Sequence, residues 1–196
     1  MVTTVSAAGP DRASLDAATS DEHSLVLAAQ RDRGAFAALY LRYAARIYAY
    51  LRTRTASTDE ATDLTQQVFM NALAALDRYR VGAAPFSAWL FRIAMNAATD
   101  RHRRRQPTFP LEAALDISDG SNLEEQATRS DELRWLRVTV QALPTAEQEL
   151  LALRFAGGLT SREIASLVRR SEAAVKKQLW RTLRALKEKH DATTDE

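Results

Sequence analysis

The chain has 196 residues, of which 46% are hydrophobic and 27% are charged, and its formal net charge is +2. It contains no cysteine, which excludes disulfides, cysteine-ligated zinc and iron–sulfur sites, and thiol nucleophiles. No apolar run approaches the roughly 18 residues that a membrane helix needs, and the first 20 residues lack the basic start and apolar core of a signal peptide. We therefore expect a cytoplasmic protein without membrane insertion, long enough for two small domains.

The charged residues follow the order basic, acidic, basic along the chain. Arg101 and the arginines at 103–105 surround His102, whereas residues 106–128 contain five acidic residues and no Lys or Arg. Basic residues return in the stretch 162–189. Because the net charge is small, any affinity for nucleic acid must come from these local clusters.

We predict an all-α protein, because apolar residues recur at helical spacing and no alternating strand pattern of useful length is present. Residues 1–22 have no periodicity, and we expect them to form a disordered leader. An apolar stripe that starts at Phe36 and includes Tyr40 predicts a helix of several turns. Thr58 and Asp59 have the chemistry to cap a second helix.

A third helix is predicted after a break in regular structure at residues 81–85. Ser87 can cap this helix, which then runs into the arginine cluster. Pro107 and Pro110 follow, and acidic residues and a Gly-Ser-Asn turn come after them. We interpret residues 107–130 as a linker between two helical halves.

The second half of the chain has the pattern of a helix-turn-helix. Capping boxes are predicted at Thr145–Gln148 and Thr160–Glu163, and a tight turn at Arg169 and Arg170 precedes a longer helix that Ser171 can cap. This helix is apolar on one face and rich in Lys and Arg on the other, as a helix in the DNA major groove would be. The alternative is a solvated basic face on an ordinary helical hairpin.

Three runs of residues carry a family resemblance. The run Leu143–Phe155, continued by Gly157–Ala165, closely resembles the domain of bacterial sigma factors that binds the minus-thirty-five promoter element. The run Glu60–Phe69 resembles the polymerase-binding helix of sigma factors of the extracytoplasmic-function (ECF) type. The run Phe86–Arg105 resembles their promoter-melting helix, and it is the most specific of the three. The resemblance extends over residues 24–189.

For the first half of the chain, the resemblance implies a polymerase dock and a strand-opening surface. Asp63, Gln66 and Gln67 inherit by position the contact with the coiled-coil clamp of the largest polymerase subunit. The loop Tyr79–Pro85 matches the family loop that captures a flipped base of the minus-ten element. Unpaired bases need cations for their phosphates and pockets or flat side chains for the bases. The residues assigned to minus-ten DNA are Tyr79, Arg80, Arg92, Asn96, Asp100, Arg101, Arg103 and Arg104.

Two residues of the promoter-melting helix have open roles. Trp89 is either a core anchor or a stacking platform, and its helical spacing to Phe86 and Ile93 favours the core. Asn96 can read a base edge or form a local cap, and spacing leaves both open.

For the second half, the resemblance assigns the minus-thirty-five contact to the turn and the helix that follows it. The sequence departs from the family pattern at Arg169, where Gly is usual, and at three positions of the recognition helix, Ala174, Lys177 and Gln178. Trp135 and Leu136 either complete the core of this half or contact a protein partner. The residues assigned to minus-thirty-five DNA are Arg170, Ser171, Glu172, Lys176, Lys177 and Arg181.

The resemblance implies a sigma factor that binds the clamp and flap of core RNA polymerase, recognises both promoter elements, promotes DNA melting and is controlled by an anti-sigma factor. His23, His102 and His190 are scattered without metal-ligand spacing or a paired nucleophile, so we predict no catalysis, metal or cofactor. The alternative is a stand-alone helix-turn-helix regulator. The expected domains are a leader at 1–22, sigma region 2 at 23–106, a linker at 107–130, sigma region 4 at 131–190 and a tail at 191–196.

In this family the linker threads the polymerase interior near the template and the nascent RNA, whereas the alternative is a solvated tether. We predict that deletion of residues 111–120 impairs initiation more than promoter binding by the holoenzyme, because acidic residues repel DNA phosphates. Run-off transcription measures the first quantity and equilibrium promoter binding the second. Equal loss of both would contradict a role for the linker inside the polymerase.

Overall fold

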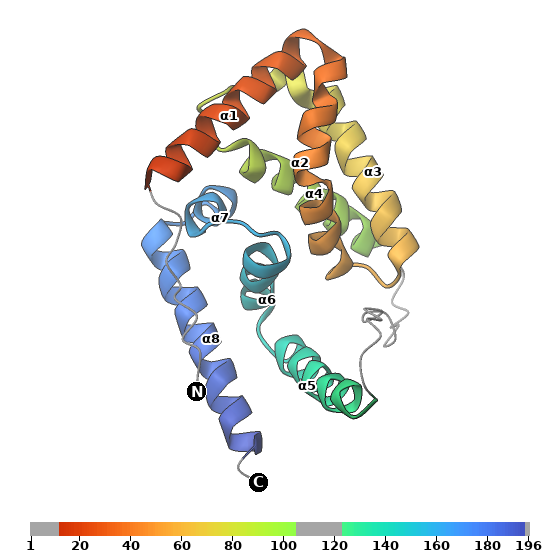
Figure 1. Cartoon of the computed structure of the whole chain (residues 1–196), viewed down its shortest axis with the longest axis vertical. Helices are drawn as coiled ribbons and strands as arrows, with labels where there is room; N and C mark the ends of the chain where they lie inside the picture. The colour runs from red at the N-terminus through yellow and green to blue at the C-terminus, as the bar shows by residue number, and fades with distance from the viewer. Residues whose placement is uncertain (1–11, 105–122, 195–196) are drawn as a thin grey trace.

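The computed structural model describes residues 12–104 and 123–194. Within these two ranges every regular element is helical, which confirms the prediction of an all-α protein. The α-helices are α1 (Arg12–Arg31), α2 (Phe36–Arg52), α3 (Thr58–Ala75), α4 (Phe86–Arg104), α5 (Leu123–Gln141), α6 (Thr145–Leu151), α7 (Ser161–Val168) and α8 (Glu172–Thr194). Helices α1 to α4 form the N-terminal module and helices α5 to α8 the C-terminal module (Figure 1).

The helix predicted from Phe36 is α2, and its apolar stripe faces the core. Leu39, Tyr43 and Ile47 recur every four residues and are buried, as expected for the inner face of an amphipathic helix. Tyr40 departs from the prediction, since 42% of it is exposed. It lies at the edge of the stripe, where its ring contacts α3 on one side and leaves the other side open.

The cap of α3 is one residue earlier than predicted. Ser57 has an extended backbone, and its hydroxyl oxygen accepts a hydrogen bond from the N–H of Glu60 at 3.1 Å. Thr58 and Asp59 already belong to the first helical turn, so the prediction that they supply the cap is wrong.

The start of α4 is capped from another helix. The backbone N–H of Phe86 donates to a carboxylate oxygen of Glu22, which is buried on α1, at 3.2 Å. The prediction that Ser87 caps this helix is wrong. Ser87 lies inside the first turn and is fully buried, and its hydroxyl donates to Glu163 of α7 at 2.5 Å.

The predicted leader at residues 1–22 is wrong in its second half, because α1 begins at Arg12. This helix places Val26 and Ala29 in the core, where both are fully buried. Its large apolar residues, at positions 15 and 25–27, are too unevenly spaced to form an apolar stripe, so periodicity alone did not indicate it. Residues 1–11 lie outside the described residues.

The predicted linker at residues 107–130 overlaps α5, which begins at Leu123. The overlapping residues have good helix propensity but no apolar stripe, so the pattern gave no helical signal. The rest of the linker falls within residues 105–122, which lie outside the description. The predicted tail at 191–196 is also helical in part, because α8 continues to Thr194.

The helix-turn-helix of the C-terminal module has the predicted local chemistry. Thr160 and Glu163 form a reciprocal capping box at the start of α7. Arg169 ends α7 in the left-handed conformation, with φ of 56°, which confirms the tight turn. The hydroxyl of Ser171 accepts from the N–H of Ala174 at 3.2 Å and so caps α8, as predicted.

The capping box predicted at Thr145–Gln148 does not form. Pro144 stands at the cap position of α6 and provides no side-chain hydrogen bond. The carboxylate of Glu147 faces α8 instead, where it accepts from Gln178 at 2.9 Å and from Thr182 at 3.1 Å. Glu147 therefore joins α6 to α8 and does not close its own helix end.

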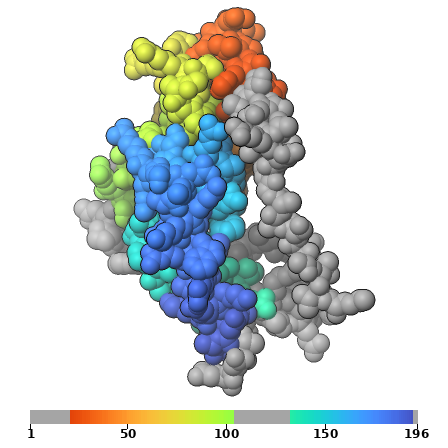
Figure 2. Space-filling model, turned by 90° about the vertical axis from the view of Figure 1, so that its left-hand side faces the viewer, coloured from red at the N-terminus to blue at the C-terminus, as the bar shows by residue number. Residues whose placement is uncertain are grey.

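The two modules share one continuous cluster of buried apolar side chains. Phe91 of α4 is fully buried and lies against Gly157, which follows the π-helical turn η3 (Ala152–Ala156). A Cβ atom at Gly157 would lie 2.7 Å from the Phe91 ring. Figure 2 shows the face that carries α7 and α8, whose blue surface borders the yellow and green surface of the N-terminal module.

Two arginines of the N-terminal module donate hydrogen bonds to backbone carbonyls of the C-terminal module. The guanidinium of Arg46 donates to the carbonyls of Gly157 at 2.8 Å and Gly158 at 3.0 Å. The guanidinium of Arg92 donates to the carbonyl of Leu167, in the last turn of α7, at 2.7 Å. Carbonyls at a helix C-terminus lack partners within the helix and carry partial negative charge, so guanidinium groups suit them.

One carboxylate of the C-terminal module adds two further contacts. Glu149 accepts from the hydroxyl of Tyr50 at 2.8 Å and from the guanidinium of Arg54 at 2.5 Å. The side chains of Arg54 and Glu149 are about one-fifth exposed, so water screens this ion pair only in part.

Gly157→Ala tests the contact between the modules. The backbone of Gly157 has φ of −75°, which alanine adopts freely, so any loss of stability must come from the new Cβ atom. We expect a loss of about 1–3 kcal/mol, the usual cost of overpacking. The new Cβ atom would also lie 2.9 Å from the backbone carbonyl oxygen of Leu153. Chemical unfolding of Gly157→Ala, Phe91→Leu and the double variant separates the two clashes. If the losses of the single variants simply add in the double variant, the clash with the Phe91 ring is not the cause.

The buried tyrosines make stability depend on alkaline pH. Burial raises the pKa values of Tyr43 and Tyr50, and burial followed by the charge of Glu22 raises the pKa of Tyr79 to about 12. Between pH of about 10 and about 12 the folded chain keeps protons that the unfolded chain releases, so the free energy of unfolding falls as pH rises. Urea unfolding across this range measures the fall. Tyr79→Phe should show a shallower dependence, and identical slopes would contradict the assignment.

Candidate functional site

The residues predicted to bind the polymerase lie together on the outer face of α3. Asp63, Gln66 and Gln67 are all exposed, and the amide of Gln67 donates to Asn71 one turn later at 2.8 Å. The apolar residues of the same run point inward, as expected, since Val68 is fully buried.

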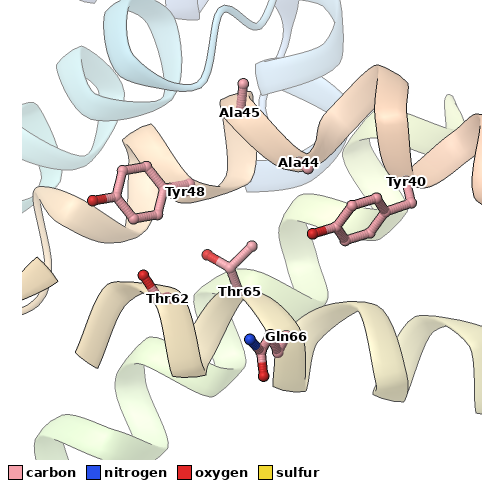
Figure 3. Close-up of a pocket in the computed structure, with 7 residues that line it drawn as sticks. All are labelled: Tyr40, Ala44, Ala45, Tyr48, Thr62, Thr65 and Gln66. Carbon is pink, nitrogen blue, oxygen red and sulfur yellow. The ribbon is translucent and has the colours of Figure 1, made fainter. Parts of the chain in front are cut away.

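A hollow of about 270 Å³ lies between α2 and α3, next to these polar residues (Figure 3). Tyr40 and Tyr48 line it from α2, and Thr62, Thr65 and Gln66 line it from α3. The hollow therefore joins one predicted docking residue to an aromatic surface that the sequence did not predict.

Large apolar side chains are exposed on the same helices. Met70 lies one turn after Gln66 and is 66% exposed, and Leu41 of α2 is 79% exposed. The sequence could have indicated Met70 as part of the docking face, because residues four apart, such as Gln66 and Met70, share a helix face. Exposed apolar side chains beside polar ones are typical of a protein-binding surface.

A second hollow, of about 250 Å³, lies at the loop between α3 and α4. The 3-10 turn η2 (Leu76–Arg78) leads into this loop. Arg78 and Arg80 border the hollow, and both are exposed. The remaining lining residues are Tyr79, Ala83, Ala84 and Trp89.

Aromatic rings build the wall of this hollow. The rings of Tyr79, Phe86 and Trp89 lie within 5.2 to 5.4 Å of one another, centroid to centroid. The hydroxyl of Tyr79 donates to the carbonyl of Ala84 at 2.7 Å, which ties the ring to the far side of the loop. Trp89 packs in this cluster and also lines the hollow, so its two predicted roles are compatible.

The predicted minus-ten residues of α4 differ in their surroundings. Arg92 is occupied by carbonyls of α7, namely Leu167 at 2.7 Å and Ser166 at 3.3 Å. Arg101 pairs with the buried Glu60 at 2.7 Å, although half of the Arg101 side chain remains exposed. Asn96, Asp100 and Arg103 are exposed as well, and Arg104 is the last residue of the helix.

The predicted minus-thirty-five residues lie at the turn before α8 and in its first half. Glu172 and Lys176 form an ion pair of 2.6 Å one turn apart. Ser171 serves as the helix cap, so its hydroxyl oxygen already has a partner. All four cations of the set are exposed, namely Arg170, Lys176, Lys177 and Arg181.

Trp180 is an exposed residue of α8 that the sequence analysis did not single out. It is 61% exposed, and the guanidinium carbon of Arg184 lies 5.4 Å from its ring centroid. Its spacing of three residues from Lys177 and four from Arg184 places it on the basic face. An aromatic ring among cations extends the surface that can contact nucleic acid.

Within the described residues, no group of three or more His, Asp or Glu side chains has the arrangement of a metal site. The helices described also include none with the length and apolar character needed to cross a membrane.

Two family models match the chain in the regions that carry these surfaces. Residues 39–108 match Sigma-70 region 2, and residues 133–186 match Sigma-70 region 4. The first match contains both hollows and α4, and the second contains most of the helix-turn-helix module.

Individual relatives agree with the family models. The ECF RNA polymerase sigma factor SigD of Mycobacterium tuberculosis is 31% identical over 153 residues, which cover 74% of this chain and 72% of the relative. The ECF RNA polymerase sigma-E factor of Escherichia coli is 31% identical over 169 residues, which cover 81% of this chain and 87% of the relative.

A solved structure of CnrH in complex with the cytosolic domain of CnrY has a similar fold, with a TM-score of 0.64 and 25% identity. The similarity covers 87% of this chain and 97% of that one. Sigma factors are transcription initiation factors that bind core RNA polymerase and promoter DNA. With two sigma regions in order and relatives that match most of its length, the chain belongs to the ECF RNA polymerase sigma factors.

Proposed function

We propose that this sigma factor captures an unpaired base of the minus-ten element in the hollow at the loop 79–85. The observation that carries the proposal is the combination of aromatic walls with flanking cations. The half-buried Trp89 offers a flat apolar surface, and the largely buried Tyr79 lines the hollow beside it. The exposed Arg78 and Arg80 border the hollow and can contact phosphates of the same strand. Stacking on aromatic side chains and neutralisation of phosphates are the two requirements for binding single-stranded DNA.

The exposed face of α4 extends this surface. Asn96 and Arg103 lie on the same helix as Trp89 and are free to contact the strand on either side of the captured base. Arg101 contributes less, since Glu60 holds its guanidinium.

The outer face of α3 is the proposed dock for core polymerase. Asp63 supplies charge, and Gln66 and Gln67 supply hydrogen-bonding groups at the rim of the hollow between α2 and α3. The exposed apolar surface of Met70 continues this face. Apolar area bordered by polar groups supports a protein partner and not DNA.

The basic face of α8 is the proposed reader of the minus-thirty-five element. A capped helix that presents Lys177, Trp180 and Arg181 to solvent can enter the major groove and contact phosphates at its borders. Family membership sets aside the alternative of a stand-alone regulator, because such a protein needs no polymerase.

An anti-sigma factor is the proposed regulatory partner, and the cytoplasm, where RNA polymerase acts, is the proposed location. The similarity to CnrH, whose structure contains the cytosolic domain of a second protein, supports a protein partner for this chain as well. Trp135 and Leu136 remain candidates for that contact. Leu136 is 43% exposed, whereas the ring of Trp135 contacts His190 of α8.

The division of labour between the modules is testable by matched charge changes. Arg181→Ala should weaken promoter binding by the holoenzyme and lower its salt dependence by about one unit of slope, the value for one lost phosphate contact. Asp63→Ala should instead weaken core binding, by about threefold to tenfold for one rim residue of an interface. Fluorescence anisotropy with labelled promoter or labelled sigma factor measures each affinity.

Lys189→Ala and Glu132→Ala are the controls, since each removes one exposed charge outside the two proposed surfaces. Both should leave the two affinities unchanged. If Arg181→Ala and Asp63→Ala both reduce the same affinity, either for promoter or for core polymerase, the assignment of separate tasks to the two modules is wrong.

A further inference from the structure

Helix α1 holds both ends of the loop that forms the proposed base-binding hollow. The side-chain amide of Gln30 donates to the carbonyls of Leu76 at 3.0 Å and Tyr79 at 2.8 Å, where the loop begins. The carboxylate of Glu22 accepts from the N–H of Phe86 at 3.2 Å, directly after the loop ends. These two contacts come from one helix that precedes the matched Sigma-70 region 2, which starts at residue 39.

The two hydrogen bonds of Gln30 fix the direction in which the chain leaves the turn η2. The carbonyl of Leu76 already accepts from the N–H of Tyr79 at 3.0 Å, and the two N–H bonds of the Gln30 amide add one hydrogen bond to this carbonyl and one to the carbonyl of Tyr79. The carbonyl and the ring of Tyr79 are attached to the same residue, so loss of the contact at the carbonyl shifts the ring as well. Gln30 is half-buried, so water would replace the amide only in part.

Glu22 positions the other end of the loop through Phe86. The carboxylate is buried, accepts a hydrogen bond from the hydroxyl of Tyr43, and stands at the N-terminus of α4, where the helix dipole favours negative charge. The Phe86 ring lies 5.4 Å from the Tyr79 ring and 5.3 Å from the Trp89 ring. A change at Glu22 therefore shifts the backbone of Phe86, and with it the ring that packs against Tyr79 and Trp89.

Besides the hydrogen bond from the Tyr79 hydroxyl to the Ala84 carbonyl, the loop between these anchors has little to fix its shape by itself. Gly82 has φ of 89°, which only glycine adopts without strain, and nothing lies within 4 Å of the position its Cβ would occupy. The N–H of Ala83 donates to the carbonyl of Arg80 at 3.2 Å. A loop with an open middle takes its shape mainly from where its ends are held.

We propose that Gln30 and Glu22 are positioning residues for base capture, because they hold Tyr79 and Phe86 in the arrangement that lets the hollow receive an unpaired base. The proposal rests on the proposed function of the hollow. Neither residue contacts DNA in this scheme. Packing of α1 on the module is supplied separately by Val26 and Ala29, which are fully buried.

The test uses the holoenzyme and a single-stranded non-template oligonucleotide from a promoter that it transcribes. The same oligonucleotide carries an abasic site at each minus-ten position in turn. In the wild type, one abasic position should weaken binding by about tenfold, as expected for the loss of one stacked base worth 1–3 kcal/mol. Gln30→Met keeps the length of the side chain and removes its donors. This variant should bind the intact oligonucleotide about tenfold more weakly than the wild type does. Its affinities for the intact and the abasic oligonucleotide should then be equal.

Two further variants separate positioning from folding. Glu22→Gln keeps an oxygen that can accept from the N–H of Phe86, so it should still bind the intact oligonucleotide more tightly than the abasic one. Glu22→Met lacks this oxygen and should bind both equally. Gln141→Met, at an exposed amide at the end of α5, is the matched control and should behave as the wild type.

The outcomes assign failure to one proposal or the other. If the wild type shows no sensitive abasic position, base capture by the hollow is wrong, and the role of α1 is wrong with it. If the wild type is sensitive and Gln30→Met remains equally sensitive, only the role of α1 is overturned. Equal weakening for intact and abasic oligonucleotides, together with weaker core binding, would show a general structural role and would also overturn it.

Discussion

The arrangement of the molecule depends on arginines of the N-terminal module that hold the ends of helical segments in the C-terminal module. Arg92 reaches the last turn of α7, and Arg46 reaches the carbonyls that follow η3. Each guanidinium supplies several donors in a fixed plane to carbonyls that have no partner within their own helix. These contacts bring α4 against α7 and close the apolar core around Phe91.

The same contacts limit what the N-terminal module can do in this arrangement. Arg92 is on the helix that carries the proposed minus-ten surface, and one nitrogen of its guanidinium donates to two carbonyls of α7, which directs the group toward the C-terminal module. A DNA phosphate would therefore compete with these carbonyls for Arg92, because hydrogen bonds between ionised groups are strong. The hollow at the loop 79–85 has no such conflict, since none of its lining residues belongs to the C-terminal module.

Local patterns in the sequence predicted the parts of the structure that depend on local chemistry. Periodicity indicated α2, and the capping box at Thr160 and the turn at Arg169 were predicted from neighbouring residues. The sequence patterns did not predict contacts between residues that are far apart in the chain. Gln30 and Glu22 act on backbone atoms 46 to 64 residues away, and a backbone carbonyl or N–H has no signature in the sequence. The family resemblance indicated the loop but not the helix that holds it.

The two proposed DNA surfaces obtain selectivity by different physical means. The hollow of the N-terminal module is lined by packed aromatic rings held by backbone hydrogen bonds, so it selects by shape and stacking, and salt screens its flanking cations Arg78 and Arg80. The surface of α8 consists of long exposed side chains, some already engaged in ion pairs such as Lys176 with Glu172. Its contribution is electrostatic, and dissolved salt screens it. In the proposed scheme the cations of α8 add affinity to its reading of the minus-thirty-five element. The anchored loop adds discrimination at the minus-ten element, because its aromatic rings are held in one arrangement.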